Sequence, residues 1–263
     1  MLGMNRPSDV GKDPGGNPQA EDRAGQVARS LGARLIVGAV EAMVVSVPLT
    51  VLTALVISHS GPLHRLDQGI ADSLHGYVAP RPVLSSTLGL ISVITHPNSV
   101  RLASAALAGA LWWQGHRRRA AWLAVTIAVG GGLDPLLKDA IARARPAFDQ
   151  PITTAPGYSF PSGHALNSML FAVCVVMLGY GVTRGRPVLR TLLWAFAVLL
   201  VLVTGFDRIA LGVHYTSDVV AGWLVALLTV AVTTAAFESW RRDVGLRPSD
   251  TSVGLDPERG SDE

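Results

Sequence analysis

Long apolar stretches dominate the hydropathy pattern of this chain. Six of them approach the roughly 20 residues that a membrane-spanning helix needs, at 35–57, 99–113, 120–137, 165–182, 189–205 and 217–237. Most of the segments between them are short and carry basic residues. A large soluble helical core, the alternative, does not explain so many apolar stretches of this length. We therefore predict an all-α fold, an integral membrane six-helix bundle.

The two ends of the chain are polar. Residues 1–34 are rich in Gly, Pro and charged side chains, and residues 238–263 have a similar composition, which is typical of disordered segments. The first apolar stretch begins only after Arg34, too late for a cleavable signal peptide. The pattern predicts disordered cytoplasmic tails over 1–34 and 238–263, and a membrane domain over 35–237.

A long loop, residues 58–98, follows the first predicted span and contains a helical periodicity. The apolar positions are Leu63, Leu66, Ile70, Leu74, Tyr77 and Val78, and the polar positions are His64, Arg65, Asp67, Gln68 and Asp72. We predict an amphipathic helix that lies on the outer membrane surface. A helix packed against the spans is an equal alternative, because periodicity does not show what covers an apolar face.

The composition fits a membrane protein. The chain is 49% hydrophobic and only 16% charged, whereas soluble domains average about 25% charged residues. Its one cysteine, Cys174, excludes an intramolecular disulfide framework and a Cys-rich metal site. The net charge of +3 comes without a long basic run, so we expect no nucleic-acid partner.

The distribution of Lys and Arg predicts how the spans are oriented. With the N-terminus inside, fifteen of the 22 basic residues lie in the tails and inner loops, as the positive-inside tendency favours. Five tryptophans then fall near the inner ends of the spans, at the depth of an aromatic belt. The pattern predicts a multi-pass protein of the cell membrane with both termini cytoplasmic.

Four of the seven outer basic residues lie in segments 138–146 and 207–218, and the polar segment 160–164 is predicted at the same membrane face. The polar residues of interest are Lys138, Arg143, Arg145, Ser162, Gly163, His164, Arg208, His214 and Asp218. Arg and Lys suit phosphate oxygens, and the first N–H groups of a helix point at an anion. Histidines beside an anion can act as nucleophile and general acid. These residues predict an outer site for a multiply charged oxyanion.

Each of these residues taken alone has a simpler interpretation. Basic side chains at a membrane boundary usually extend to the headgroups, and a histidine at a span end is usually interfacial. Neither interpretation predicts that they gather on the side where Lys and Arg are disfavoured. Asp134 lies four residues before Lys138 and has two possible roles. It could form an ion pair with that lysine or make a polar contact between spans.

The three segments resemble the signature of the type 2 phosphatidic acid phosphatase superfamily, which includes vanadium-dependent haloperoxidases. That signature reads Lys, six residues, Arg-Pro; then Pro-Ser-Gly-His; then Ser-Arg, five residues, His, three residues, Asp. Ten of its eleven specified positions match here, and the resemblance covers about residues 60–237. The exception is Asp207, which stands where the family has serine.

The resemblance implies a role for each matching residue. His214 would attack phosphorus and form a phosphohistidine, Asp218 would orient His214, and His164 would protonate the leaving oxygen. The phosphate oxygens would be held by Lys138, Arg145, Ser162, Gly163 and Arg208, with Arg143 as a helper. No carboxylates of metal-binding spacing accompany the histidines, so we expect no metal and no cofactor.

The resemblance implies an integral membrane phosphatase with its site at the outer face. Its substrate would be a phosphomonoester or diphosphate of a membrane lipid, such as phosphatidic acid, phosphatidylglycerol phosphate or undecaprenyl diphosphate. Two alternatives are a lipid phosphotransferase with the same intermediate and a non-catalytic lipid-binding or transport protein. Because binding alone needs only the cations, the intact His164, His214 and Asp218 argue against the second. The sequence does not indicate an oligomeric state.

Overall fold

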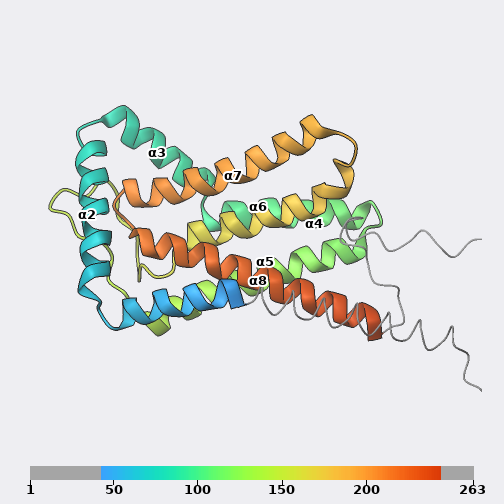
Figure 1. Ribbon diagram of the computed structural model, residues 1–263. Coiled ribbons are helices and arrows are strands. Elements are labelled where there is room, and N and C mark those ends of the chain that lie inside the picture. Colours follow the sequence, from blue (N-terminus) through green and yellow to red (C-terminus); the bar gives the residue numbers. More distant parts are fainter. Residues whose placement is uncertain (1–42, 244–263) are drawn as a thin grey trace, which may run out of the picture. The chain divides into compact units, whose positions relative to one another are not determined.

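The computed structural model describes residues 43–243, with side chains described up to residue 237. The described residues form helices and loops, without a strand among them. In chain order the helices are Met43–Ile57, α2 (Gly61–Val78), α3 (Pro82–Ile94), α4 (Pro97–Trp113), α5 (Arg117–Ile141), α6 (Gly163–Val182), α7 (Pro187–Ala210) and α8 (Thr216–Asp243) (Figure 1). The predicted tail 1–34 lies outside the described residues. So does most of the tail 238–263, although α8 continues past its predicted boundary to Asp243.

Four of the described helices are long and apolar enough to cross a membrane, namely α5, α6, α7 and α8. They coincide with the last four predicted spans. The helix Met43–Ile57 and α2 pass the same test only as a pair, and they are bent by 91° at their junction. Helix α4 coincides with the predicted span 99–113, but at 17 residues it is not among the candidate spans. The predicted count of six therefore stays a prediction.

Helix α6 is the central element of the bundle, in contact with α4, α5, α7 and α8. Leu166 and Leu170 are fully buried, and they pack against Trp122 of α5 and Ala226 of α8. A helix that is apolar on all sides is expected where neighbours surround it. This packing fixes the start of α6 relative to the ends of α5, α7 and α8.

Helix α2 crosses the end of the bundle and contacts α3, α7 and α8 (Figure 1). The predicted polar face is wrong at Asp67, which is 1% exposed, whereas the predicted apolar residues Leu66 and Tyr77 are 60% and 56% exposed. The reason is that Asp67 faces the start of α8 and finds its partner Ser217 there, whereas Leu74 and Val78 of α2 pack into an apolar cluster. Packing against the spans thus describes α2 better than a helix that rests on the membrane.

The structure contains one helix that the hydropathy pattern did not predict. Helix α3 is 13 residues long, too short for a span of about 20 residues. It contacts α2, α4 and α7. Ser92 in its last turn reaches the region where the three polar segments meet.

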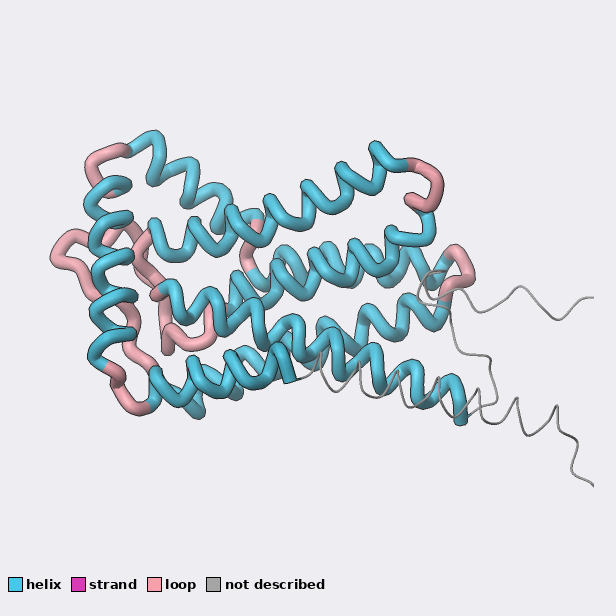
Figure 2. Tube along the Cα trace, viewed as in Figure 1, coloured by secondary structure: helices cyan, strands magenta, loops and turns pink. Residues whose placement is uncertain are grey.

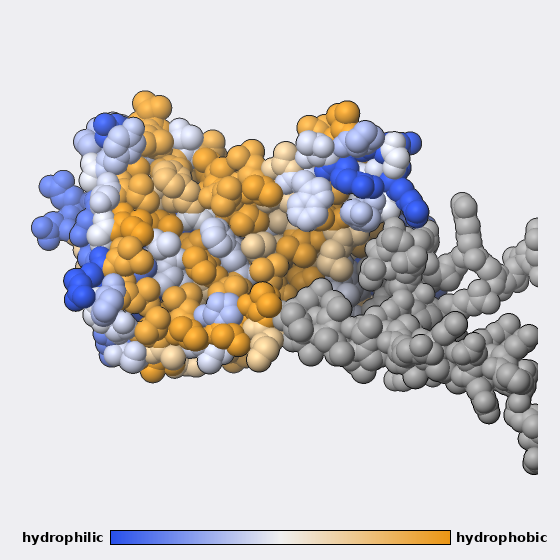
Figure 3. All heavy atoms as spheres, in the orientation of Figure 1, coloured by the Kyte–Doolittle hydropathy of each residue, from blue (hydrophilic) through white to orange (hydrophobic). Residues whose placement is uncertain are grey.

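The described helices have the surface of a membrane protein. Most connections are short, and residues 142–162 form a long one (Figure 2). In Figure 3, apolar residues cover the middle of the visible face, while hydrophilic residues lie toward its ends. On α7 alone, Leu199 and Leu202 are 63% and 55% exposed. An apolar surface this broad indicates contact with lipid. Together with the four candidate spans, it supports a multi-pass membrane protein.

Candidate active site

The three polar segments meet at the end of the bundle that α2 crosses. The backbone N–H of Ser162 donates to the carbonyl of Asp218 over 2.9 Å, which ties the start of α6 to the start of α8. The turn between α7 and α8 carries His214, and Gly212 in that turn has a φ of 73°. A Cβ at Gly212 would lie 2.7 Å from the ring of Phe148. A glycine is therefore needed for both the backbone conformation and the close approach of the 142–162 loop.

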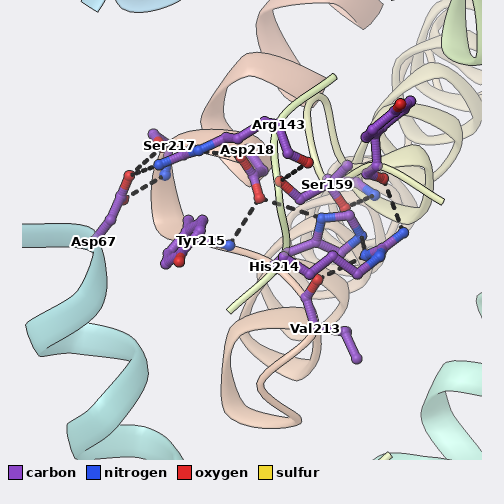
Figure 4. A network of polar contacts seen from close by, with 12 residues as sticks. Asp67, Arg143, Ser159, Val213, His214, Tyr215, Ser217 and Asp218 are labelled. Atoms are coloured by element: carbon purple, nitrogen blue, oxygen red, sulfur yellow. Dashed lines mark hydrogen bonds and ion pairs between the residues drawn. The ribbon is translucent and has the colours of Figure 1, made fainter. Parts of the chain in front are cut away.

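His214 is 3% exposed and has a different partner on each side of its ring. Its Nε2 lies 3.2 Å from Nη1 of Arg145, and its Nδ1 lies 3.5 Å from Oδ2 of Asp218 (Figure 4). Because a guanidinium only donates, Nε2 accepts and the ring proton is assigned to Nδ1, facing the carboxylate. Burial lowers the pKa of His214, Asp218 raises it, and Arg145 and Arg208 lower it, so that the pKa falls below its ordinary value. The neutral ring has an unshared electron pair on Nε2 at neutral pH.

His164 lies in the first turn of α6 and is partly buried. Its Nε2 is 3.3 Å from Nη1 of Arg208 and 3.3 Å from the backbone carbonyl of Ser92. Which of these contacts is a hydrogen bond depends on the tautomer of the ring. Each histidine therefore has an arginine beside its Nε2, as expected of groups that share one anion.

Arg145 spans the site and also holds the 142–162 loop. Its guanidinium donates to the carbonyls of Pro156, Gly157, Tyr158 and Val213 at 2.7–3.1 Å. Burial lowers the pKa of Arg145, Asp218 and Asp134 raise it, Arg208 lowers it further, and the net pKa is lowered. Two cations that repel each other, Arg208 buried and Arg145 partly buried, favour an anion between them.

Arg208 is 4% exposed, at the end of α7. Its Nε donates to Oδ2 of Asp207 at 3.0 Å, and its Nη2 donates to Oγ of Ser92 at 2.6 Å. Asp207 stands where the resembling family has serine, and here its carboxylate holds the guanidinium in place. The substitution therefore keeps the cation, oriented by a charge-assisted hydrogen bond.

Asp134 lies against both Lys138 and Gly163. Nζ of Lys138 lies 3.1 Å from Oδ1 of Asp134, which confirms the ion pair over the simple polar contact. A Cβ at Gly163 would lie only 2.6 Å from Oδ2 of the same carboxylate. Ser162 is the N-cap of α6 and is fully buried. The start of α6 therefore lies between Lys138 and the turn that carries His214.

Residues 119–242 match the sequence model of the PAP2 superfamily. This segment belongs to the PAP2 superfamily. Phosphatidylglycerophosphatase B of Bacillus subtilis (strain 168) is 34% identical over 100 residues, which cover 36% of this chain and 47% of the relative. Lipid phosphate phosphatase delta of Arabidopsis thaliana is 27% identical over 132 residues, which cover 46% and 32%. The chain thus spans less than half the length of these curated relatives.

The fold is also that of a solved PAP2 protein. The crystal structure of a transmembrane PAP2-type phosphatidylglycerolphosphate phosphatase from Bacillus subtilis superposes with a TM-score of 0.63 at 23% identity. The superposition covers 77% of this chain and 98% of that structure. Every predicted site residue lies within the PAP2 segment, whereas α2 and α3 precede it.

Arg143, which we predicted to assist phosphate binding, directs its donors at side chains of the candidate site. Its Nη1 donates to Asp218 Oδ1 and Ser217 Oγ, both at 2.6 Å, and its Nη2 donates to Asp67 Oδ2 at 2.8 Å (Figure 4). Burial lowers the pKa of Arg143, but Asp218 and Asp67 raise it above its ordinary value. A phosphate contact by Arg143 stays a prediction, because its donors bind the carboxylates.

Sequence reasoning missed the contributions of Asp67, Ser92 and Ser217. Ser217 lies between His214 and Asp218, so its place in the PAP2 motif could have drawn attention to it. Asp67 and Ser92 lie outside the PAP2 segment, and no spacing links them to it. Among the residues that the structure describes, no group of three or more His, Cys, Asp or Glu side chains could hold a metal ion.

Proposed function

We propose that this chain is an integral membrane lipid phosphatase that removes phosphate from a phosphomonoester or diphosphate of a membrane lipid. The observation that carries the proposal is the environment of His214, a buried histidine of lowered pKa between Arg145 and Asp218. A second histidine, His164, lies on the other site arginine. The names of both curated relatives, each a lipid phosphatase, support the same reaction.

In the first step, Nε2 of His214 attacks phosphorus and forms an N–P bond while the bond to the leaving oxygen breaks. His164 gives its proton to that oxygen, so a phosphomonoester leaves as its lipid alcohol and a diphosphate leaves as its lipid monophosphate. The Nδ1 proton of His214 stays on the ring and faces Asp218, which stabilises the positive charge that the imidazole gains. The product of this step is a phosphohistidine.

In the second step, water attacks the phosphohistidine and His164 accepts a proton from it. The N–P bond breaks, inorganic phosphate forms, and His214 returns to its neutral state. Arg145 and Arg208 stabilise the charge on the equatorial oxygens in both steps. Lys138, Ser162 and Gly163 bind the remaining oxygens, and Arg143 assists.

We further propose that the lipid is presented from the outer leaflet. The topology that we predict, six spans with both termini in the cytoplasm, would put the site at the outer face of the cell membrane. A lipid tail can then stay in the bilayer while its headgroup enters the site. Phosphatidylglycerol phosphate is the first substrate to test, because both the curated relative and the solved structure from Bacillus subtilis are named for it.

The experiment that tests the function is phosphate release from a lipid panel by the purified protein in detergent. Wild type should release inorganic phosphate, and His214→Ala should release none and form no phosphoenzyme with a phosphate-labelled substrate. His116→Ala is the matched control, because His116 lies at the start of α5, whereas the site residue Lys138 lies in the last turn of that helix. A lack of release from every lipid, or full activity in His214→Ala, would contradict the proposal.

We propose that the reaction needs no metal ion, since fixed cations carry the phosphate charge that a divalent ion would otherwise carry. Phosphate release should then persist in excess chelator after dialysis. An activity that disappears in chelator and returns on titration with Mg²⁺ would count decisively against this part of the proposal.

A further inference from the structure

Asp67 is a buried carboxylate on a helix outside the PAP2 segment. It is 1% exposed, yet it belongs to α2, whose polar residues were expected to face solvent. One oxygen accepts from the backbone N–H of Ser217 at 3.0 Å, and the other accepts from Oγ of Ser217 and from Arg143. Because Ser217 lies in the first turn of α8, Asp67 satisfies a free donor at that helix start, as an N-cap residue would.

Arg143 connects Asp67 to the carboxylate that faces the nucleophile. Its two terminal nitrogens lie 2.8 Å from Asp67 and 2.6 Å from Asp218. The exposed fractions of these side chains are 13% for Arg143, 1% for Asp67 and 0% for Asp218. In ion pairs this buried, the loss of one member leaves the charge of its partner uncompensated. The three groups form one unit with a net charge of −1.

Asp218 needs this support because its contact with His214 is loose. The distance from Oδ2 to Nδ1 of His214 is 3.5 Å, longer than a hydrogen bond. Oδ2 also accepts from the backbone N–H of Tyr215 at 2.9 Å. Arg143 holds the other oxygen. The orientation of the carboxylate toward His214 is therefore set by Arg143 and the backbone, and Asp67 anchors Arg143.

We infer that Asp67 is a positioning residue for the phosphatase reaction, acting through Arg143 and Ser217 to hold Asp218 against His214. This inference rests on the proposed function. It assigns to α2 a part in the chemistry of a site whose motif residues all lie on later elements. Tyr215 reinforces the link, since its hydroxyl donates to Oε1 of Gln68 on α2 at 3.1 Å.

The charge of Asp67 matters as well as its geometry. As the N–P bond forms, His214 becomes a cationic ring, and the unit of Asp67, Arg143 and Asp218 offsets that charge. The other titratable or charged groups that face His214 are Arg145, Arg208 and His164. Without the charge of Asp67 the unit becomes neutral, and these neighbours leave the cationic ring less stable. Phosphoenzyme formation should slow, and protonation of His214 should require a lower pH.

Asp67→Asn tests this inference, because the amide keeps the shape of the side chain and removes its charge. The variant and wild type are compared on the same lipid phosphate for kcat, KM, the acid limb of kcat/KM and Tm in detergent. We expect kcat to fall on the order of tenfold, the scale for residues that orient a reacting group, with KM unchanged. We also expect the acid limb to move to lower pH. Asp72→Asn, on the exposed side of α2, is the matched control and should match wild type.

The outcomes separate this inference from the proposed function. If wild type releases no phosphate, the function fails before Asp67 is tested. If wild type is active and Asp67→Asn keeps its kcat and acid limb, the inference is wrong, and a lower Tm alone would leave Asp67 a merely structural contact. Asp67→Glu should recover the acid limb.

Should Asp67→Asn fail to fold, Ser217→Ala takes its place. It removes the hydroxyl between Asp67 and Arg143 and leaves every charge in position. A kcat several-fold below wild type at unchanged KM is expected, and a wild-type kcat would overturn the inference.

Discussion

At the scale of single residues, the loss of the proposed general acid should slow the reaction by an amount that depends on the leaving group of the substrate. His164→Ala removes the proton donor, so kcat on an alkyl phosphate should fall by about 10²–10⁴-fold, the usual contribution of a general acid. The aryloxide of an aryl phosphate leaves without needing a proton, so kcat on that substrate should fall far less. The measurement is kcat on a matched alkyl and aryl pair. Equal losses on both substrates would mean that His164 only binds phosphate.

The lowered pKa of His214 predicts the acid side of the pH profile. The ring reacts in its neutral form, which is present above its pKa and is lost as the pH falls through it. Because burial holds the pKa of His214 below the ordinary value, which is about 6.5, the acid limb of kcat/KM should lie below about pH 6.5. A limb at higher pH would contradict this assignment.

A control is needed because a phosphomonoester also titrates near pH 6, with a second pKa of about 6. The profile is therefore repeated with a phosphate ester whose second pKa is lower. A limb that belongs to His214 stays in place, whereas a limb that belongs to the substrate moves with its pKa.

At the scale of helices, the apolar pattern predicted the helices of the bundle and the presence of α2, but it predicted neither the burial of Asp67 on α2 nor the helix α3. Helices α5 to α8 are long and apolar, and these two properties together indicate a span. Helix α3 is too short for that signal. The buried face of α2 carries Asp67 and His75, because the helix ends beneath it present donors and charges. Hydropathy cannot predict such a face, since the partners come from distant parts of the sequence.

The same limit applies to the site. Short-range spacing was sufficient to name His164, His214, Asp218 and their cations, because the motifs keep these residues close to helix ends. It did not predict that Arg143 pairs with Asp67 of α2, nor that α3 brings Ser92 to Arg208. In the reaction that we propose, the motif supplies the reacting groups, and the packing of helices outside the PAP2 segment supplies part of their orientation.

The close contact at the start of α6 can be tested with one methyl group. Gly163→Ala would put a Cβ 2.6 Å from Asp134 Oδ2, and overpacking of this kind costs about 1–3 kcal/mol. We expect a lower Tm in detergent and a loss of phosphate release, because Asp134 and its partner Lys138 must shift. Gly132→Ala on α5 is the control, since nothing lies within 4 Å of its added Cβ. A wild-type Tm and activity in Gly163→Ala would show that the contact is not tight.

At the scale of the whole molecule, the basic residues form two groups: those that favour one orientation of insertion, and those of the candidate site. Fifteen of the 22 basic residues belong to the side that we predict to be cytoplasmic. Lys138, Arg145 and Arg208 lie at the other end of the helices, against the positive-inside tendency. Their ion pairs and contacts with the histidines explain why they are kept there. The orientation and the outer site are thus one prediction.

Cysteine labelling in intact cells tests that orientation across a single span. Cys174, which is buried, is first replaced by Ala. One cysteine is then placed at Asp149, in the loop after α5, or at Gln114, just before α5; both positions are exposed. Because α5 is long and apolar enough to cross the bilayer, a membrane-impermeant thiol reagent should modify the Asp149→Cys variant alone. Permeabilised cells should show both variants modified, which controls for reactivity. Modification of Gln114→Cys alone would invert the topology and place the site in the cytoplasm, so that an outer-leaflet lipid could no longer be the substrate.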